Sequence, residues 1–185
     1  MRRAAISIPI LALSLLIAGC GDGSLIIGVD ILSYLDPSER ELAYSVPGGM
    51  AAVDADVASK GMSLLPGVED ATVVSSATLQ LAASFDHLTG DASGMLRLYM
   101  APSDTVNPFT TPPIDSVPVP LVPGNVTNVT KEITSDALAR ALVGNKARVG
   151  IRVTFDTMAT PLLGTAAGTV TITQLTATVI TKKDF

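Results

Sequence analysis

The chain alternates apolar and polar residues over several stretches, as strands do when one face is buried and the other is wet. Residues 73–85 carry Val, Ala, Leu and Phe on one parity and mainly Ser, Thr and Gln on the other. A similar segment at 96–100 follows the turn residues within 86–94, so the two segments predict a hairpin. The clearest alternation lies at 146–155, where the apolar face consists of Ala147, Val149, Ile151, Val153 and Phe155. These segments predict an antiparallel sheet that is covered on one side.

Two further segments depart from simple alternation. Within residues 168–181 the apolar parity changes after Ile172, which predicts a β-bulge near Gln174. Residues 24–35 carry apolar side chains on both parities. This second pattern predicts a strand that is covered on both faces and lies inside a sheet.

One short helix is predicted just before the strand at 146–155. Ser135 suits its N-cap, Asp136 favours its positive end, and Leu138 and Leu142 lie one turn apart. Gly144 is suited to end the helix. The helix therefore connects strands and does not form a layer of its own.

Residues 101–124 contain seven of the twelve prolines in the chain. Proline fixes φ and removes a hydrogen-bond donor, so this stretch is predicted to be a long loop or an irregular edge strand. No helix is long enough for the crossovers of a parallel sheet. The predicted fold is therefore all-β, an antiparallel β-sandwich of jelly-roll type with one short helix.

The N-terminal residues have the pattern of a secretory signal peptide. Arg2 and Arg3 precede an apolar run, Ile6 to Ile17, that is too short to span a bilayer. Two small residues, Ala18 and Gly19, then precede Cys20, the only cysteine in the chain. A sulfur nucleophile at this position is what attachment of a lipid by a thioether bond requires.

The segment Leu16-Ile17-Ala18-Gly19-Cys20 resembles the lipobox of bacterial lipoproteins, although that family more often has leucine where Ile17 stands. The resemblance implies cleavage before Cys20 and attachment of palmitate-type acyl chains to it. Two or three acyl chains hold a protein on a bilayer without a membrane-spanning helix. Because Gly21 and not an aspartate follows the cysteine, the resemblance favours the outer membrane over the inner one.

These patterns divide the chain into a signal peptide at 1–19, a lipidated tether at 20–24 and a β-sandwich domain at 25–185. The signal peptide removes two of twelve basic residues and none of seventeen acidic ones, which leaves 166 residues with a formal charge of −7. Such a length is typical of one domain. An acidic chain without tryptophan does not suit nucleic acid, because phosphate binding needs clustered Lys and Arg.

Motifs for catalysis and cofactor binding are missing from the sequence. The single histidine, His87, is expected to be an exposed residue of the hairpin loop, without further imidazole or thiol ligands for zinc or copper. There is neither a G-x-S-x-G nucleophile elbow nor a phosphate-binding glycine loop. The sequence therefore predicts no enzyme, no cofactor and no metal site.

Two pairs of carboxylates are candidates for glycoside hydrolysis or calcium binding. Asp54 and Asp56 share one face of any strand there, and Asp86 and Asp91 are placed to meet across a loop. Neither pair has the spacing of a calcium-binding loop. Both are interpreted as solvated acids.

Two features are candidates for ligand binding. Lys146, Arg148 and Arg152 form a cationic stripe on one strand face, to which phosphate or an anionic lipid headgroup would bind, although a solvated polar face also explains it. Sugar binding by aromatic stacking needs exposed Trp or Tyr, and the chain has no tryptophan and three tyrosines: Tyr34, Tyr44 and Tyr99.

The sequence thus predicts a non-enzymatic protein of the cell envelope, anchored to a membrane through lipid on Cys20. Its expected role is structural, or it docks onto another envelope protein or a glycan. One alternative is a carbohydrate- or ligand-binding module, with a concave sheet face lined by Asn, Gln, Tyr or acids. Another is a hydrolase with dispersed carboxylates, which needs two acids roughly 5–10 Å apart in a cleft.

Overall fold

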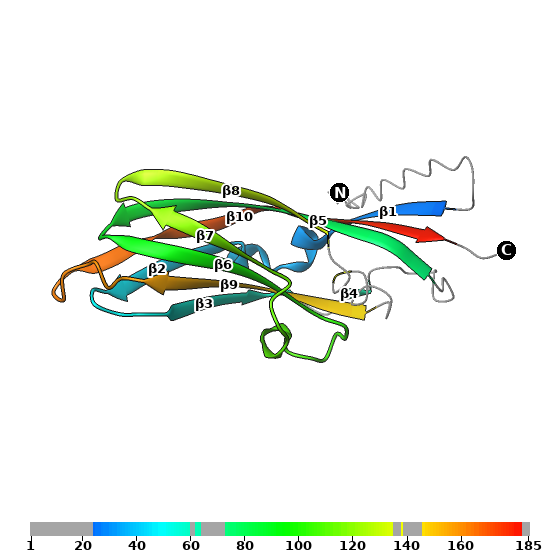
Figure 1. Ribbon diagram of the computed structural model, residues 1–185, viewed down its shortest axis with the longest axis horizontal. Helices are drawn as coiled ribbons and strands as arrows, with labels where there is room; N and C mark the ends of the chain where they lie inside the picture. The colour runs from blue at the N-terminus through cyan, green and yellow to red at the C-terminus, as the bar shows by residue number, and fades with distance from the viewer. Residues whose placement is uncertain (1–23, 60–61, 64–72, 135–137, 139–145, 183–185) are drawn as a thin grey trace, which may run out of the picture.

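The computed structural model describes residues 24–59, 62–63, 73–134, 138 and 146–182, and these form two antiparallel sheets packed face to face (Figure 1). Sheet A consists of β1 (Ser24–Asp30), β2 (Glu41–Pro47), β5 (Val73–Thr89), β8 (Asn125–Thr134) and β10 (Thr165–Lys182). Sheet B consists of β3 (Val53–Ala58), β4 (Met62–Ser63), β6 (Ala92–Ala101), β7 (Asp115–Leu121) and β9 (Lys146–Asp156). The predicted antiparallel β-sandwich is confirmed.

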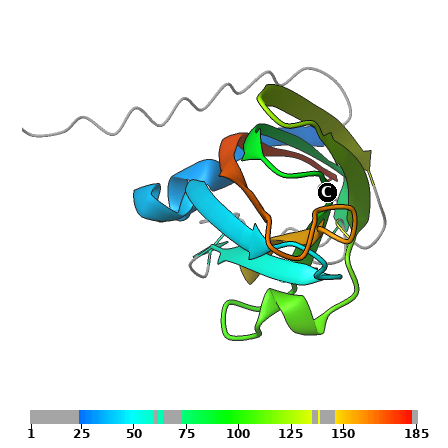
Figure 2. The same ribbon diagram turned by 90° about the vertical axis from the view of Figure 1, so that its left-hand side faces the viewer.

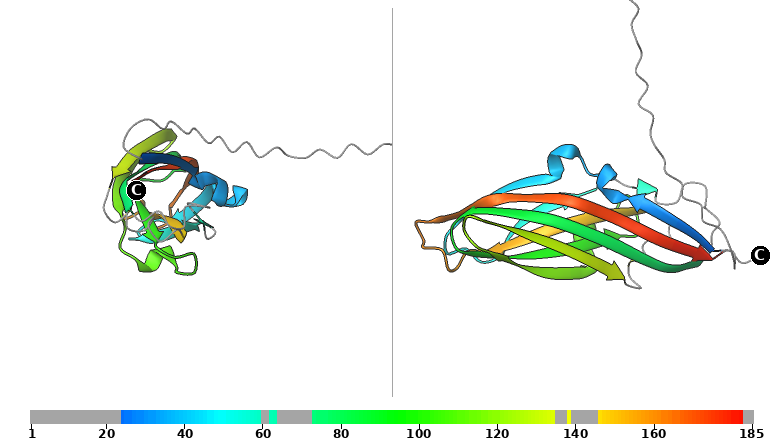
Figure 3. Two further views of the ribbon diagram at one scale, coloured as in Figure 1. Left: turned by 90° about the vertical axis from the view of Figure 1, so that its right-hand side faces the viewer. Right: turned by 90° about the horizontal axis from the view of Figure 1, so that it is seen from above.

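The strand order is that of a jelly roll. Along sheet A the order is β2-β10-β5-β8, with β1 following β2 on the same edge of β10, and along sheet B it is β3-β9-β6-β7 (Figure 3). β1 and β2 pair with the same edge of β10, and β3 and β4 pair with the same edge of β9, so each pair occupies one position in its five-stranded sheet. From β4 to β10 successive strands change sheet, except for β6 and β7, which pair with each other. Sheets connected in this way form the double Greek key of a jelly roll.

The core lies between the sheets and is built from the alternating apolar positions. Phe85, Leu79 and Leu81 of β5 are buried against Phe155 and Ile151 of β9 in one continuous cluster. The five apolar residues predicted for 146–155 are all buried, and the polar residues between them face outward. Alternation therefore predicted the buried face of these strands correctly.

The predicted bulge and the predicted edge strand are both present. The register of β10 against β5 shifts between Ile172 and Gln174, which is where the apolar parity changes. The proline-rich stretch contains a loop with the 3₁₀ turn η3 (Pro108–Thr110), and then β7, which pairs only with β6 among the described strands. An edge strand tolerates Pro118 and Pro120 because one of its sides needs no ladder partner.

The predicted hairpin between residues 73–85 and 96–100 is wrong. β5 lies in sheet A and β6 in sheet B, and Gly90 and Asp91 carry the chain from one sheet to the other. Gly90 adopts a φ of +79°, a conformation that suits glycine. Alternation indicates which face of a strand is buried, but a strand of either sheet can satisfy it.

The prediction that residues 24–35 form a strand inside a sheet is also wrong. β1 pairs only with β10 among the described strands, and the side chain of Ile26 is 49% exposed. The strand ends at Asp30, whose carboxylate accepts a hydrogen bond from Leu32 N at 3.1 Å and begins the 3₁₀ turn η1 (Ile31–Tyr34). A second such turn, η2 (Pro37–Glu39), leads into β2. The mixed apolar parity of this segment comes from the change of structure at Asp30.

The predicted helix at 135–144 lies outside the described residues, except for Leu138, which is helical and fully buried. Among the residues that the structure describes, none belongs to a helix with the length and hydropathy needed to cross a membrane.

The two ends of the sandwich differ. At one end, the proximal end, β1 begins at Ser24 opposite Lys182, the last residue of β10 (Figure 1). At the other end lie the loops 48–52, 90–91, 122–124 and 157–164, which we call the distal tip (Figure 2). β10 runs from one end to the other in 18 residues, or about 60 Å at 3.3 Å per residue.

Candidate functional site

The predicted lipid attachment site, Cys20, lies outside the described residues. It stands four positions before Ser24, the first residue of β1. Four residues reach about 14 Å when fully extended. A lipid on Cys20 would therefore hold the proximal end of the sandwich close to a bilayer and leave the distal tip at the far end.

Arg152 of the cationic stripe pairs with the two aspartates that were predicted to share a strand face. Its Nε and Nη2 donate to the two carboxylate oxygens of Asp56 at 2.6 and 2.7 Å, and its Nη1 lies 3.5 Å from Asp54 Oδ2. The hydrogen bond with Asp56 raises the pKa of the Arg152 guanidinium further above its usual range. Asp54 and Asp56 do lie on one face of β3, where they neutralise this cation.

The other two residues of the stripe, Lys146 and Arg148, also contact polar groups of the chain. Lys146 Nζ lies 3.4 Å from an Asp104 carboxylate oxygen, and Arg148 Nε donates to the carbonyl of Ser59 at 2.8 Å. An anion at this stripe would have to compete with these contacts. Anion binding here remains a prediction.

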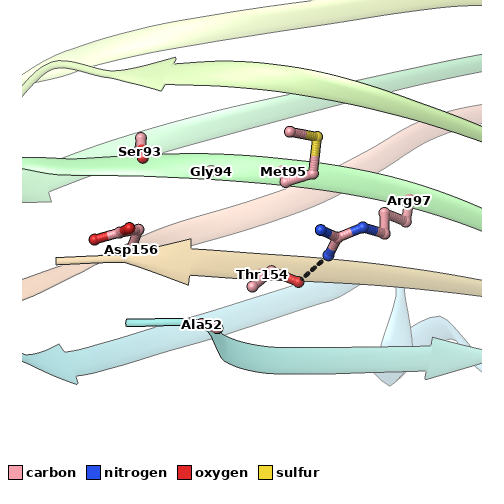
Figure 4. A pocket seen from close by; sticks show the side chains of 7 residues that line it. All are labelled: Ala52, Ser93, Gly94, Met95, Arg97, Thr154 and Asp156. Atoms are coloured by element: carbon pink, nitrogen blue, oxygen red, sulfur yellow. Dashed lines mark hydrogen bonds between the residues drawn. The ribbon is translucent and has the colours of Figure 1, made fainter. Parts of the chain in front are cut away.

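A shallow pocket of about 220 Å³ lies beside this network on the outer face of sheet B (Figure 4). Its lining includes Ser93, Arg97, Thr154 and Asp156. Arg97 donates to the Thr154 hydroxyl, and that hydroxyl donates to Asp54 at 2.6 Å. The pocket is smaller than the roughly 300–1,000 Å³ of typical ligand sites. It holds one carboxylate, Asp156, and so lacks the acid pair that the hydrolase alternative requires.

The prediction that His87 is an exposed loop residue is wrong. β5 continues to Thr89, and His87 is fully buried on the core-facing side of this strand. Its Nδ1 lies 2.6 Å from Tyr44 Oη, and its Nε2 lies 2.5 Å from the carbonyl oxygen of Gly90. The two polar contacts explain how an imidazole is accommodated inside an apolar core.

The partners of His87 determine its tautomer. A carbonyl oxygen only accepts, so Nε2 carries the proton and donates to Gly90, while Nδ1 accepts from the Tyr44 hydroxyl. Burial, with a smaller contribution from Asp86, raises the pKa of Tyr44 to about 12. Tyr44 therefore keeps its proton at neutral pH and remains the donor that this tautomer needs.

We expect Tyr44→Phe to lower the free energy of unfolding by about 1–3 kcal/mol, because it leaves the buried Nδ1 of His87 without a donor. Urea denaturation of the purified domain measures this loss. The matched control is Tyr34→Phe, at a tyrosine that is 36% exposed. Equal stabilities of the two variants would contradict the role given to the Tyr44 hydroxyl.

Hydrogen bonds fix the loops of the distal tip above this buried pair. Gly48 N and Gly49 N donate to the carbonyls of Gly164 and Thr157, each at 2.9 Å. The buried hydroxyl of Thr157 donates to the Pro47 carbonyl at 2.7 Å. Thr160, which is also buried, donates to the Asp91 carbonyl. The loops 48–52, 90–91 and 157–164 are therefore tied to one another.

The outer face of sheet A is a polar surface that crosses three strands. Gln174 of β10 donates to Gln80 of β5 at 3.1 Å, and Gln80 donates to Glu132 of β8 at 3.4 Å. Threonines surround this row, among them Thr78, which lies 3.2 Å from Thr134, and Thr176. The row itself thus offers amide, carboxylate and hydroxyl groups, and Tyr44 and Tyr99 are buried elsewhere.

The distal tip was not found from the sequence. Its most exposed residues, Leu162 and Leu163, follow Pro161 and precede Gly164, and such residues predict only a turn. Two adjacent leucines in a predicted turn were the available signal. The Tyr44–His87 pair had no such signal, because 43 positions separate its members.

In the described part of the chain, no three His, Cys, Asp or Glu side chains are grouped so that they could hold a metal ion. This observation concerns only the residues placed by the structure.

Comparison with known proteins finds solved structures that align with this chain at low sequence identity. No protein-family model matches the chain, and no curated protein matches it. The structure of infectious bursal disease virus Gt strain aligns with a TM-score of 0.47 at 8% identity, over 99% of this chain and 43% of the viral one. The chain thus spans less than half the length of that protein.

Two carbohydrate-binding structures also align. The C-terminal CBM6 of LamC from Zobellia galactanivorans has a TM-score of 0.35 at 13% identity, covering 85% of this chain and 99% of that one. A structure that describes the promiscuous specificity of carbohydrate-binding modules from the β-sandwich superfamily has a TM-score of 0.36 at 12% identity. The alignment covers 85% of this chain and 57% of that one. At these scores we base no functional argument on the similarity.

Proposed function

We propose that this protein is a non-enzymatic, lipid-anchored component of a bacterial cell envelope, held by acyl chains on Cys20. The observation that carries the proposal is the position of Ser24, the first residue of β1, in the sandwich. Ser24 lies at the proximal end, four positions after the lipobox cysteine, whereas four connecting loops form the opposite end. Anchoring there displays the distal tip away from the membrane, as a docking role requires.

The described sites support a binding role more than a catalytic one. The pocket on sheet B is shallow and contains one carboxylate, while Asp54 and Asp56 are both paired with Arg152. The buried histidine is used to hold the carbonyl of Gly90 beneath the distal tip. These groups serve the structure of the sandwich.

The displayed orientation can be measured by energy transfer to a bilayer. Once Cys20 carries lipid, an introduced cysteine is the only free thiol, because the chain has a single native cysteine. Leu163→Cys labels the distal tip and Ile26→Cys labels β1, and both native side chains are exposed. In lipidated protein reconstituted into liposomes with acceptor-labelled headgroups, we expect strong quenching at position 26 and weak quenching at position 163.

Liposomes without acceptor serve as the control for both labels. Equal quenching at the two positions would show that the sandwich lies flat on the bilayer. Stronger quenching at position 163 would show that the tip faces the membrane. Either result contradicts the proposed display.

A carbohydrate-binding module is the second candidate, and the outer face of sheet A favours it. The row of Gln174, Gln80 and Glu132 matches the amide and acidic lining expected for such a module. No tyrosine belongs to this row, so recognition by it would depend on hydrogen bonds. Specific retention of the purified domain on immobilised envelope glycans would favour this candidate over protein docking.

A further inference from the structure

Exposed apolar side chains concentrate at the distal tip. Ten large hydrophobic side chains are exposed in the described part of the chain, and seven of them lie in the tip loops or at the strand ends beside them. These seven are Met50, Leu88, Val122, Val126, Met158, Leu162 and Leu163. Leu162 is 80% exposed and Leu163 is fully exposed. Scattered apolar residues need no explanation, but a group at one end of a molecule marks an interaction surface.

The fold keeps these residues exposed in a defined arrangement. The hydrogen bonds of Thr157, Thr160, Gly48 and Gly49 tie three loops of the tip together. Gly49 has a φ of +77°, and a side chain at that position would meet the Leu162 side chain. The leucine turn is therefore packed on the neighbouring loop and needs little further ordering on binding, which favours affinity.

The charges around the tip restrict what covers it. The four loops contain one charged residue, Asp91, and neither Lys nor Arg. Asp156 adjoins the 157–164 loop, and Asp86 lies opposite Val126 in the register of β5 and β8. The apolar surface is thus bordered by acids, so a complementary surface is apolar with a basic border.

We infer that the distal tip is the docking surface for a second envelope protein, which presents an apolar patch bordered by Lys and Arg. Two other occupants fit the charges less well. A second copy docked tip to tip would bring the acidic borders together. A bilayer surface with anionic lipids attracts Lys and Arg near apolar residues, and the tip loops have neither. The inference rests on the proposed anchoring at Cys20 for the direction in which the tip points.

Photo-crosslinking in intact cells tests this surface with the full-length, lipidated chain. Benzoylphenylalanine replaces Met158 in the tip, whose side chain is 63% exposed, or Thr130 on the outer face of sheet A as a control position. We expect an adduct with one other protein from position 158 and none from position 130. The crosslinked peptide of that protein is expected to be apolar and flanked by Lys or Arg.

Substitutions then connect the adduct to the proposed contacts. Leu162→Asn together with Leu163→Asn is expected to lower the adduct yield at least tenfold, and Asp91→Lys at least threefold. The matched control is Val106→Asn, at an exposed apolar residue of the loop between β6 and β7, and it is expected to leave the yield unchanged. Exposed side chains contribute little to stability, so the variants should unfold at the same denaturant concentration as the wild type. If the leucine variant were unfolded, the Asp91→Lys variant would decide alone.

Five results would overturn the inference. They are no adduct from position 158, an adduct between two copies of the chain, an adduct with lipid, the same adduct from positions 130 and 158, and a yield that neither the leucine nor the Asp91 variant changes. The membrane-bound fraction is measured in the same cells. A failed crosslink with full membrane attachment rejects the docking surface alone, whereas loss of attachment rejects the proposed anchoring.

Discussion

Among chains that have lost the signal peptide, Cys20→Ser is expected to lower the membrane-bound fraction at least a hundredfold. A serine hydroxyl cannot form the thioether, so the chain receives no acyl groups from the modification that the lipobox resemblance implies. Each buried methylene contributes about 0.8 kcal/mol to membrane affinity, and two or more chains make attachment effectively permanent. Removing all of them leaves a domain whose formal charge is −7 and which an anionic bilayer does not attract.

The measurement is separation of membrane and soluble fractions from cells that produce the full-length chain. Ile17→Leu is the matched control, since it brings the segment closer to the family pattern and should preserve attachment. Chains that keep the signal peptide are larger and are counted separately on an immunoblot, because the apolar run at 6–17 can hold them on a membrane without lipid. Cys20→Ser chains without the signal peptide that are attached as fully as the wild type would refute a lipid anchor.

Gly168→Ala is expected to lower the free energy of unfolding by about 3 kcal/mol or more. Gly168 lies on β10 opposite His87, and a Cβ placed there would meet the backbone carbonyl of Asp86 and lie 2.6 Å from Tyr44 Oη. Neither the backbone carbonyl of Asp86 nor the hydrogen-bonded ring of Tyr44 can easily move away from an added methyl group. Overpacking of a rigid core typically costs 1–3 kcal/mol and sometimes more.

The matched control for this substitution is Gly28→Ala. Gly28 lies on β1, and a Cβ there would meet no atom within 4 Å. Since alanine loses less backbone entropy than glycine on folding, Gly28→Ala should be neutral or slightly stabilising. Urea denaturation of both variants gives the comparison. A Gly168→Ala protein as stable as Gly28→Ala would show that the packing around Tyr44 and His87 is wrong as described.

The buried face of several strands could be predicted from this sequence, because it follows from the polarity of each strand's own residues. The inward face of β9 and the bulge in β10 both follow from the parity of apolar residues around Phe155 and Ile172. The pairing of β5 with β10 and β8 did not follow, since the same apolar face of β5 would pack equally well in a hairpin with β6. Alternation thus predicted the class of fold and left the partner of each strand open.

The contacts that shape the candidate sites depend on residues far apart in the chain. The hydrogen bond between Tyr44 and His87 forms because β2 and β5 lie on either side of β10. The cationic stripe was predicted from β9 alone, and the acids that neutralise Arg152 come from β3, almost a hundred positions earlier. Sequence motifs do not reveal such pairs unless strand order is known.

The distal tip shows a different difficulty. Leu162 and Leu163 form an apolar stretch of only two residues in a turn, and nothing in their spacing distinguishes exposure from burial. Their exposure becomes evident only when all four loops are placed at one end of the sandwich. The proposed anchor, by contrast, is a prediction from five consecutive residues and needs no structure.

The mass of the native protein tests the proposed lipid anchor on Cys20. Protein extracted from membranes with detergent is measured intact by mass spectrometry, followed by identification of its N-terminal peptide. We expect a chain that begins at Cys20 and carries the added mass of a diacylglyceryl group on the sulfur. A membrane-extracted chain with an unmodified cysteine, or one that begins at another residue, would contradict it.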